Sequence, residues 1–256
     1  MRRAAHICAE KGCGERALSL SPFCWRHLPD RDSYISSLEE RASRGFTFEG
    51  FVLVGCDLSG MALVRLNFDM SMLEGVSMES NNLEGISLVG AVLRGSNLRG
   101  AKLRWARLEG ADFSGAMLSG ADLSGSNALG SSFKGASMEG AILEDIDLRR
   151  SMMDGANLGS ANLEGADLRE TFLEGADLSG ACLDGADLSN AVLIGAILRG
   201  ASLRGATLAG TDFRRADVEG ADFRGARVDP PSLNFEGSSP EAALWDPDVL
   251  EMLLKT

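Results

Sequence analysis

The chain has 256 residues, and 37 acidic against 25 basic side chains give it a net charge of −12 at pH 7, a balance that disfavours direct binding of nucleic acid because contacts to phosphate need cations. It contains no 18 consecutive apolar residues that could span a bilayer, and its first residues lack the apolar run of a signal peptide. Five cysteines, an odd count, do not look like a secreted disulfide framework, so we expect a cytoplasmic protein without a membrane segment.

Residues 1–28 form a short head with closely spaced metal-ligand residues. Cys8, Cys13, Cys24 and His27 follow the pattern C-x4-C-x10-C-x2-H. Three thiolates and an imidazole suit a closed tetrahedral zinc site, and a site with no open position is structural, not catalytic. The spacing resembles small treble-clef or zinc-ribbon-like knuckles, although the first pair is wider than the common C-x2-C. The alternative is that the cysteines stay reduced and pack as small apolar residues, and we expect His6 to be an exposed side chain.

A helix is predicted across residues 29–45. Asp32 or Ser33 can cap its start, and Gly45 can end it. Its apolar residues fall on one stripe: Ile35, Leu38 and Ala42. We expect this stripe to cover the first element of the segment that follows, because an uncovered strand edge invites aggregation.

From residue 46 to residue 230 one five-residue frame runs without insertion or deletion, as in ADLSG at 121–125. Of the 37 repeat centres from Phe48 to Val228, only Ala128 is not Leu, Phe, Met or Val. The residue two before the centre is mostly Ala, Ser or Thr, and the last residue is mostly Gly. A period of five fits neither the 3.6 residues of a helix nor the alternation of a strand, so the chain turns at every repeat.

The frame also predicts which residues point inward. Residues two apart on extended backbone share a face, so a centre such as Leu123 and the preceding Ala121 form the interior. The other three residues of each repeat face outward, and Gly suits the turn because it tolerates positive φ. A repeat this short cannot bury its own Leu, so the repeats must stack.

The A(D/N)LxG pattern resembles the pentapeptide repeat family, whose fold is a right-handed quadrilateral β-helix. Over residues 46–230 this resemblance implies an all-β solenoid of about nine coils, and the predicted helices would cap it at both ends. The resemblance is specific for the fold and only weakly specific for function.

A coil of 20 residues would place six apolar residues in one outward column of nine. They are Val52, Met72, Val92, Met152, Phe172 and Val192. Contiguous exposed apolar surface often marks a binding site, so the column is a candidate contact for a protein partner. The alternative is that these residues are scattered or covered by the tail. Trp105, which replaces a turn glycine beside Arg104, is a further candidate contact.

Residues 231–256 form a tail. Pro230 and Pro231 end the strand pattern, and a helix is predicted over Asp246 to Leu254. Its apolar face contains Val249, Leu250, Leu253 and Leu254. The tail either caps the last coil or mediates a homodimer, as C-terminal elements do in some pentapeptide repeat proteins.

The composition argues against an enzyme. Both histidines, His6 and His27, lie in the head, so the repeats have no histidine to activate a Ser or Cys nucleophile. We therefore expect a non-catalytic scaffold for protein interactions.

The second hypothesis is DNA mimicry, since some pentapeptide repeat proteins resemble B-form DNA in width and charge and bind type II topoisomerases. Between Glu139 and Asp187, twelve acidic residues face only three arginines. This favours DNA gyrase or topoisomerase IV as the partner, whereas the basic stretch from Arg94 to Arg107 argues against a uniformly anionic rod. We prefer the scaffold because it does not require a uniformly anionic rod.

Overall fold

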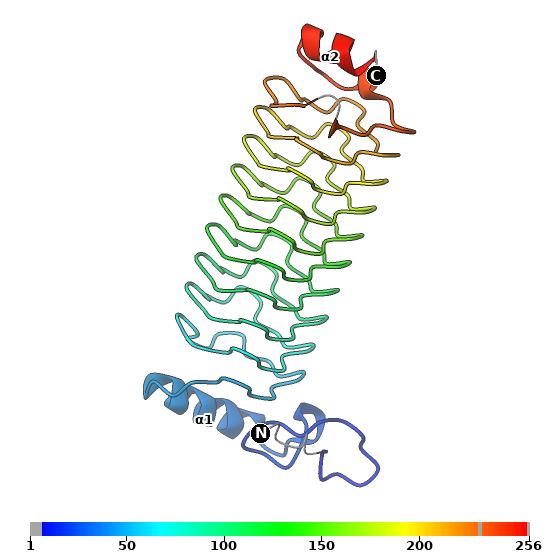
Figure 1. Ribbon diagram of the computed structural model, residues 1–256. Coiled ribbons are helices and arrows are strands. Elements are labelled where there is room, and N and C mark those ends of the chain that lie inside the picture. The colour runs from blue at the N-terminus through cyan, green and yellow to red at the C-terminus, as the bar shows by residue number, and fades with distance from the viewer. Residues whose placement is uncertain (1–6, 230–231, 255–256) are drawn as a thin grey trace.

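The computed structural model describes residues 7–229 and 232–254, so His6 and the two prolines at 230 and 231 lie outside it. The described residues form a rod of stacked coils, with α1 (Arg31–Ser43) at the N-terminal end and α2 (Pro247–Leu253) at the C-terminal end (Figure 1). Two short 3-10 helices, η1 (Trp25–His27) and η3 (Pro240–Ala242), precede α1 and α2 respectively.

Each coil takes twenty residues. Parallel bridges join residues twenty apart, from the pair Val52 and Met72 to the pair Thr207 and Arg227. Four repeats therefore make one coil, and each repeat supplies one side of a quadrilateral β-helix. Backbone hydrogen bonds join successive coils, as from Leu123 N to the carbonyl of Ile142 at 2.7 Å.

Two residues of each repeat fill the interior. Leu123 and Ala121 are fully buried, as the frame predicts, and Ala128 is buried in the same way without a shift of register. Where Thr replaces Ala at the inward position, its hydroxyl is satisfied by the preceding coil: Thr171 donates to the carbonyl of Leu148 at 2.8 Å. Buried polar groups need such partners, so this substitution is tolerated in an apolar core.

Each repeat ends at a corner where the backbone has positive φ. Most corner residues are glycines, such as Gly125 at 63°, but Trp105 adopts the same conformation at 53°. The side chain of a non-glycine corner lies over the corner of the next coil. A Cβ at Gly125 would lie 2.8 Å from Cδ1 of Trp105, and one at Gly90 would lie 2.7 Å from Sδ of Met70. At these two corners the glycine twenty residues later leaves room for the bulky side chain, whereas Arg150, Glu170 and Asn190 occupy one corner of three successive coils.

The rule that a glycine must face Trp105 predicts that Gly125→Ala is more destabilising than Gly130→Ala. Both corners have positive φ, so either substitution lowers the unfolding free energy of the protein by about 1–2 kcal/mol through backbone strain. Only Gly125→Ala also collides with Trp105, because a Cβ at Gly130 meets no atom within 4 Å, and overpacking costs about 1–3 kcal/mol more. Urea unfolding midpoints of the two variants give the comparison. Equal midpoints, or no recovery when Trp105→Ala is added to Gly125→Ala, would contradict the rule.

The ladder of coils continues beyond residue 230, where the five-residue frame ends, so the predicted boundary is corrected. Asp212 pairs with Asn234, and Asp222 pairs with Leu244, each across an interval of 22 residues instead of twenty. Aromatic rings replace leucine in this last layer and stack on the coil below: Phe235 on Phe213 at 4.9 Å, and Trp245 on Phe223 at 4.2 Å. The interval is two residues longer than in the rest of the rod, so the repeat leaves its frame here while the β-helix continues.

α2 follows directly and lies across the end of the rod (Figure 1). Val249, Leu250 and Leu253 pack against the core, whereas Leu254 is exposed. The predicted apolar face of this helix is therefore turned toward the coils, with Leu254 outside it.

At the other end, α1 is capped by Asp30, whose Oδ1 accepts the N–H of Ser33 at 2.9 Å. The cap expected at Asp32 or Ser33 is corrected, because Asp30 has the extended backbone of an N-cap and Asp32 already lies in the first turn. Tyr34 and Leu38 are buried against the first coil. Among the helices of the described residues, none is long and apolar enough to cross a membrane.

Candidate metal centre and docking surfaces

The four ligand residues predicted in the head converge. The ligand atoms of Cys8, Cys13, Cys24 and His27 lie within 4.8 Å of one another. Nδ1 of His27 is 3.6 Å from Sγ of Cys8 and 3.4 Å from Sγ of Cys24, and the sulfurs of Cys13 and Cys24 are 4.0 Å apart. Zinc bonds of about 2.3 Å to sulfur and about 2.0 Å to nitrogen put tetrahedral ligand atoms roughly 3.5–3.8 Å apart. The donor set and its spacing therefore fit a tetrahedral ion.

Local backbone structure sets these positions. Cys8 N donates to the carbonyl of Glu15 at 2.9 Å. This hydrogen bond brings Cys8, the first ligand, beside the segment that follows Cys13, the second ligand. Cys24 caps η1, and His27 N donates to its carbonyl at 3.1 Å. One 3-10 turn thus places a thiol and an imidazole three residues apart on the same side, which explains the C-x2-H spacing.

The two buried thiols have opposite proton affinities. Burial tends to raise the pKa of Cys8, but hydrogen bonds from the backbone at Cys24 and Glu10 outweigh it and lower the pKa to about 6. Burial raises the pKa of Cys24 to about 12, and the side chain of Glu15 adds to that effect. Of these two thiols, Cys8 is therefore the more acidic.

The apolar column predicted from the 20-residue coil exists as a continuous ladder of bridges, but it has two separate parts. The lower part contains Val52, Met72 and Val92, and the head contacts the first two of them: Ser19 N donates to the carbonyl of Val52 at 2.8 Å, and Arg16 approaches Sδ of Met72 at 2.7 Å. Asp112 and Ser132 then interrupt the column.

The upper part comprises Met152, Phe172 and Val192, which we call the apolar strip. The three residues pair in successive coils, so their side chains lie side by side on one flat side of the rod. Phe172 is 47% exposed, and the other two are half-buried. Trp105 lies at a corner, 60% exposed, with the guanidinium of Arg104 5.8 Å from the centre of its ring.

The basic stretch from Arg94 to Arg107 is not a patch, because twenty residues complete one turn around the rod. Its cations also meet carboxylates of the next coil: Arg94 pairs with Asp112, and Arg104 pairs with Asp122 at 2.9 Å. Runs of like charge in this sequence therefore spread over all four sides.

The acidic segment from Glu139 to Asp187 contains one column of carboxylates that pair with arginines and another column that does not. Arg149 and Arg169 bind Asp147 and Asp167 at 2.7 and 2.6 Å, and the Arg149 guanidinium lowers the pKa of Asp147. A second column, which we call the acidic strip, comprises Glu144, Glu164 and Asp184, twenty residues apart. Among the described residues, no cation lies within ion-pair distance of these three.

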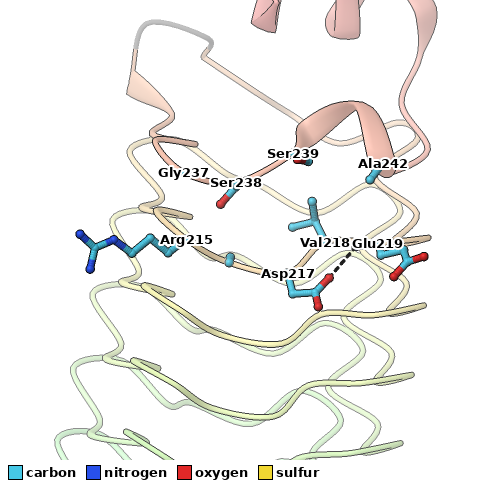
Figure 2. Close-up of a pocket in the computed structure, with 9 residues that line it drawn as sticks. Arg215, Asp217, Val218, Glu219, Gly237, Ser238, Ser239 and Ala242 are labelled. Atoms are coloured by element: carbon cyan, nitrogen blue, oxygen red, sulfur yellow. Dashed lines mark hydrogen bonds between the residues drawn. The ribbon is translucent and has the colours of Figure 1, made fainter.

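A groove that the sequence did not predict opens near the C-terminal end, with a volume of about 410 Å³ (Figure 2). Asp217 and Val218 lie on one side of it, and Ser238 and Ser239 lie on the other. The groove lies beside the last layer, which pairs with the coil below across 22 residues instead of twenty. Its lining combines the carboxylates of Asp217 and Glu219 with the hydroxyls of Ser238 and Ser239.

Comparison with known proteins agrees with this fold. The pentapeptide repeats family matches residues 82–115, 116–155, 156–193 and 186–225, with eight copies of its repeat. These segments cover more than half of the chain, which therefore belongs to the pentapeptide repeat family. No curated protein matches the chain.

Solved structures of other pentapeptide repeat proteins are similar to it. HetL, which is involved in the regulation of heterocyst differentiation in the cyanobacterium Nostoc sp. strain PCC 7120, has 27% identity and a TM-score of 0.57, over 81% of this chain and 95% of HetL. A protein of the Arabidopsis thaliana thylakoid lumen has 37% identity and a TM-score of 0.38, over 39% of this chain and 70% of its own. A trypsin-treated form of QnrB1, a plasmid-mediated fluoroquinolone resistance protein, has 19% identity and a TM-score of 0.34, over 80% of this chain and 95% of its own.

Proposed function

We propose that this protein is a non-catalytic interaction scaffold that docks a protein partner on the apolar strip. The observation that carries the proposal is the stacking of Met152, Phe172 and Val192 in successive coils with Phe172 about half exposed. An uncovered apolar strip lowers the solubility of a protein, and exposed apolar patches are typical of binding sites. The similarity to HetL, a protein involved in regulation, supports a regulatory role over a metabolic one.

Substitution of the apolar strip tests the proposal. Phe172→Asp is expected to abolish capture of the partner, because a charge at the centre of an interface must be desolvated without a counter-ion. The matched control is Ile197→Asp, which places the same charge on a 38% exposed apolar residue of a different side. Quantitative pull-downs of wild type and both variants give the readout. A partner retained by Phe172→Asp, or lost equally by both variants, would rule out the strip.

For the head we propose a structural zinc ion held by Cys8, Cys13, Cys24 and His27. The support is the tetrahedral spacing of three sulfurs and one nitrogen, which leaves no open position for a substrate. Bound zinc supplies stability to a segment too small for its own core. A reducing cytoplasm is the setting we propose, since the three cysteines must remain thiols to bind the ion.

For the tail we propose capping. Val249 and Leu250 cover the last coil, and the carboxylate of Asp246 accepts the N–H of Gly225 at 2.8 Å, so α2 is attached to the rod by apolar and polar contacts. A homodimer would use what remains exposed at this end, Leu244, Met252 and Leu254. Together with α1, we propose one helical cap at each end of the rod.

DNA mimicry is the second candidate, and the acidic strip is the observation that favours it. Glu144, Glu164 and Asp184 repeat once per coil without a paired cation, like the regularly spaced phosphates of one strand. The paired column at Asp147 and Asp167 weakens the analogy, because its charge is neutralised. DNA gyrase or topoisomerase IV would be the partner.

A supercoiling assay separates the two candidates. A DNA mimic is expected to inhibit gyrase at micromolar concentration, less so at higher salt, and to lose the effect when Glu144, Glu164 and Asp184 are all changed to lysine. The scaffold predicts no effect on gyrase and an unchanged partner for that triple variant. Inhibition that survives the charge reversal would exclude mimicry by this strip.

A further inference from the structure

We propose that the metal-bound head supplies the missing strand below the first coil, so that metal binding seals the open edge of the β-helix. In a solenoid the first coil has no coil beneath it, and its outward backbone groups would lack partners. The inference rests on the metal site proposed above and extends it from local stability to the end of the rod.

The backbone hydrogen bonds of Val52 show that the head takes the place of a coil below it. Inside the rod, Met72 N donates to the carbonyl of Phe51 at 2.8 Å, and its carbonyl accepts from Leu53 N at 2.9 Å, so both backbone groups of such a residue pair with the coil below it. Val52 has no coil on its lower side. Its N–H donates to Oγ of Ser19 at 2.9 Å, and its carbonyl accepts from Ser19 N at 2.8 Å. One residue of the head thus replaces a strand.

Ser19 is held in place from two sides. Its own carbonyl accepts the hydroxyl of Tyr34 at 2.7 Å, which ties it to α1. The preceding Leu18 is buried in the core of the rod, and its N–H donates to the carbonyl of Phe23 at 2.9 Å, which closes a tight hairpin. The N–H and Oγ of Ser19 therefore bind Val52, and its carbonyl binds α1.

The metal ligands bracket this hairpin. Cys13 and Cys24 flank the segment that contains Ser19, and their sulfurs lie 4.0 Å apart. Trp25 follows immediately and places its Cβ 4.0 Å from the Cβ position of Gly55, at the corner that ends the same side of the first coil. An ion that clamps the two cysteines fixes both Ser19 and Trp25 against residues 52–55. Without the ion, this segment is held by hydrogen bonds such as those from Leu18 N to the carbonyl of Phe23 at 2.9 Å and from Ala9 N to the carbonyl of Pro22 at 2.8 Å.

The test is hydrogen exchange at the Val52 amide, resolved by NMR or by fragmentation mass spectrometry. Ser19→Ala removes the acceptor of this amide and is expected to raise its exchange rate about tenfold, the equivalent of one hydrogen bond, while metal content stays the same. Ser36→Ala, an exposed serine on α1, is the matched control and should leave the rate unchanged. Unchanged protection of Val52 in Ser19→Ala would overturn the seal.

A second pair of variants tests the coupling to the metal. Cys24→Ser is expected to lose the ion and to raise exchange at Val52 at least as far as Ser19→Ala does, whereas the mid-rod amide of Leu123 stays protected. Cys182→Ser, a free cysteine outside the cluster, is the control. Full protection of Val52 in Cys24→Ser, together with rapid exchange in the head, would show that the seal does not depend on the metal. If the wild type binds no metal, the proposed zinc site is wrong, and Ser19→Ala still decides whether the head seals the coil.

Discussion

Purified protein is expected to contain one zinc ion per chain, and Cys24→Ser is expected to contain none. Three buried or half-buried thiols and one imidazole already lie at tetrahedral spacing, so binding needs little rearrangement. Structural zinc in small domains binds with an apparent free energy of about 10–16 kcal/mol, which exceeds any other single contribution available to the head. Elemental analysis gives the stoichiometry, and substitution by Co²⁺ gives the absorption spectrum of a tetrahedral thiolate site.

Cys182→Ser is the control for this experiment, because Cys182 is a free cysteine in the wall of the rod and should not affect metal content. A chelator strong enough to remove the ion should unfold the head while the coils keep their circular dichroism. Retention of stoichiometric zinc by Cys24→Ser, or wild-type protein that is metal-free after purification without chelator, would contradict the assignment.

The fold of the rod could be predicted because its information is local and repeated. A five-residue period determines which side chains point inward, and any slip would expose the whole apolar set, so the register has one solution. Leu123 and Leu163 are fully buried as expected. The apolar column indicated the 20-residue coil, since a 15-residue coil scatters Phe172 and Val192.

The ends were harder to predict because there the frame carries less information. Asn234, Phe235 and Gly237 keep the order of a repeat, and Oδ1 of Asn234 accepts the N–H of Glu236 at 3.0 Å as its counterparts do in the wall. The signal was therefore present in the sequence, shifted by two residues beyond the prolines. The role of Ser19 could not be found in this way, because a serine in a short hairpin has no pattern until the coil above it is placed.

The arrangement of charges on the surface could not be predicted from the sequence alone. A charge run that is contiguous in sequence wraps around the rod, so Arg94 and Arg104 face different directions and meet different carboxylates. Surface patches in this fold come from residues twenty apart. The acidic strip is such a patch, and the sequence showed only its total charge.

Trp245→Ala is expected to unravel the last layer of the rod. The indole stacks on Phe223 at 4.2 Å and meets Phe235 edge-on at 5.9 Å, and its N–H donates to the carbonyl of Pro240 at 2.9 Å. It is only 8% exposed, so its loss leaves a cavity that short loops cannot close. Removal of a buried Trp costs about 3–5 kcal/mol, which exceeds what a two-turn helix and one irregular coil can offset. Limited proteolysis should then cleave the chain beyond residue 229, and urea should release this layer before the rest.

Trp105→Ala is the matched control, because it removes the same side chain from a corner where the indole is 60% exposed. Its main contact is with the next corner, at Gly125, so the unfolding midpoint should change little. If both variants lower the midpoint equally, the aromatic layer does not close the rod. If only Trp245→Ala exposes the tail to protease, the extra coil beyond residue 230 is part of the β-helix, since the apolar face of α2 packs against the core to which Trp245 belongs.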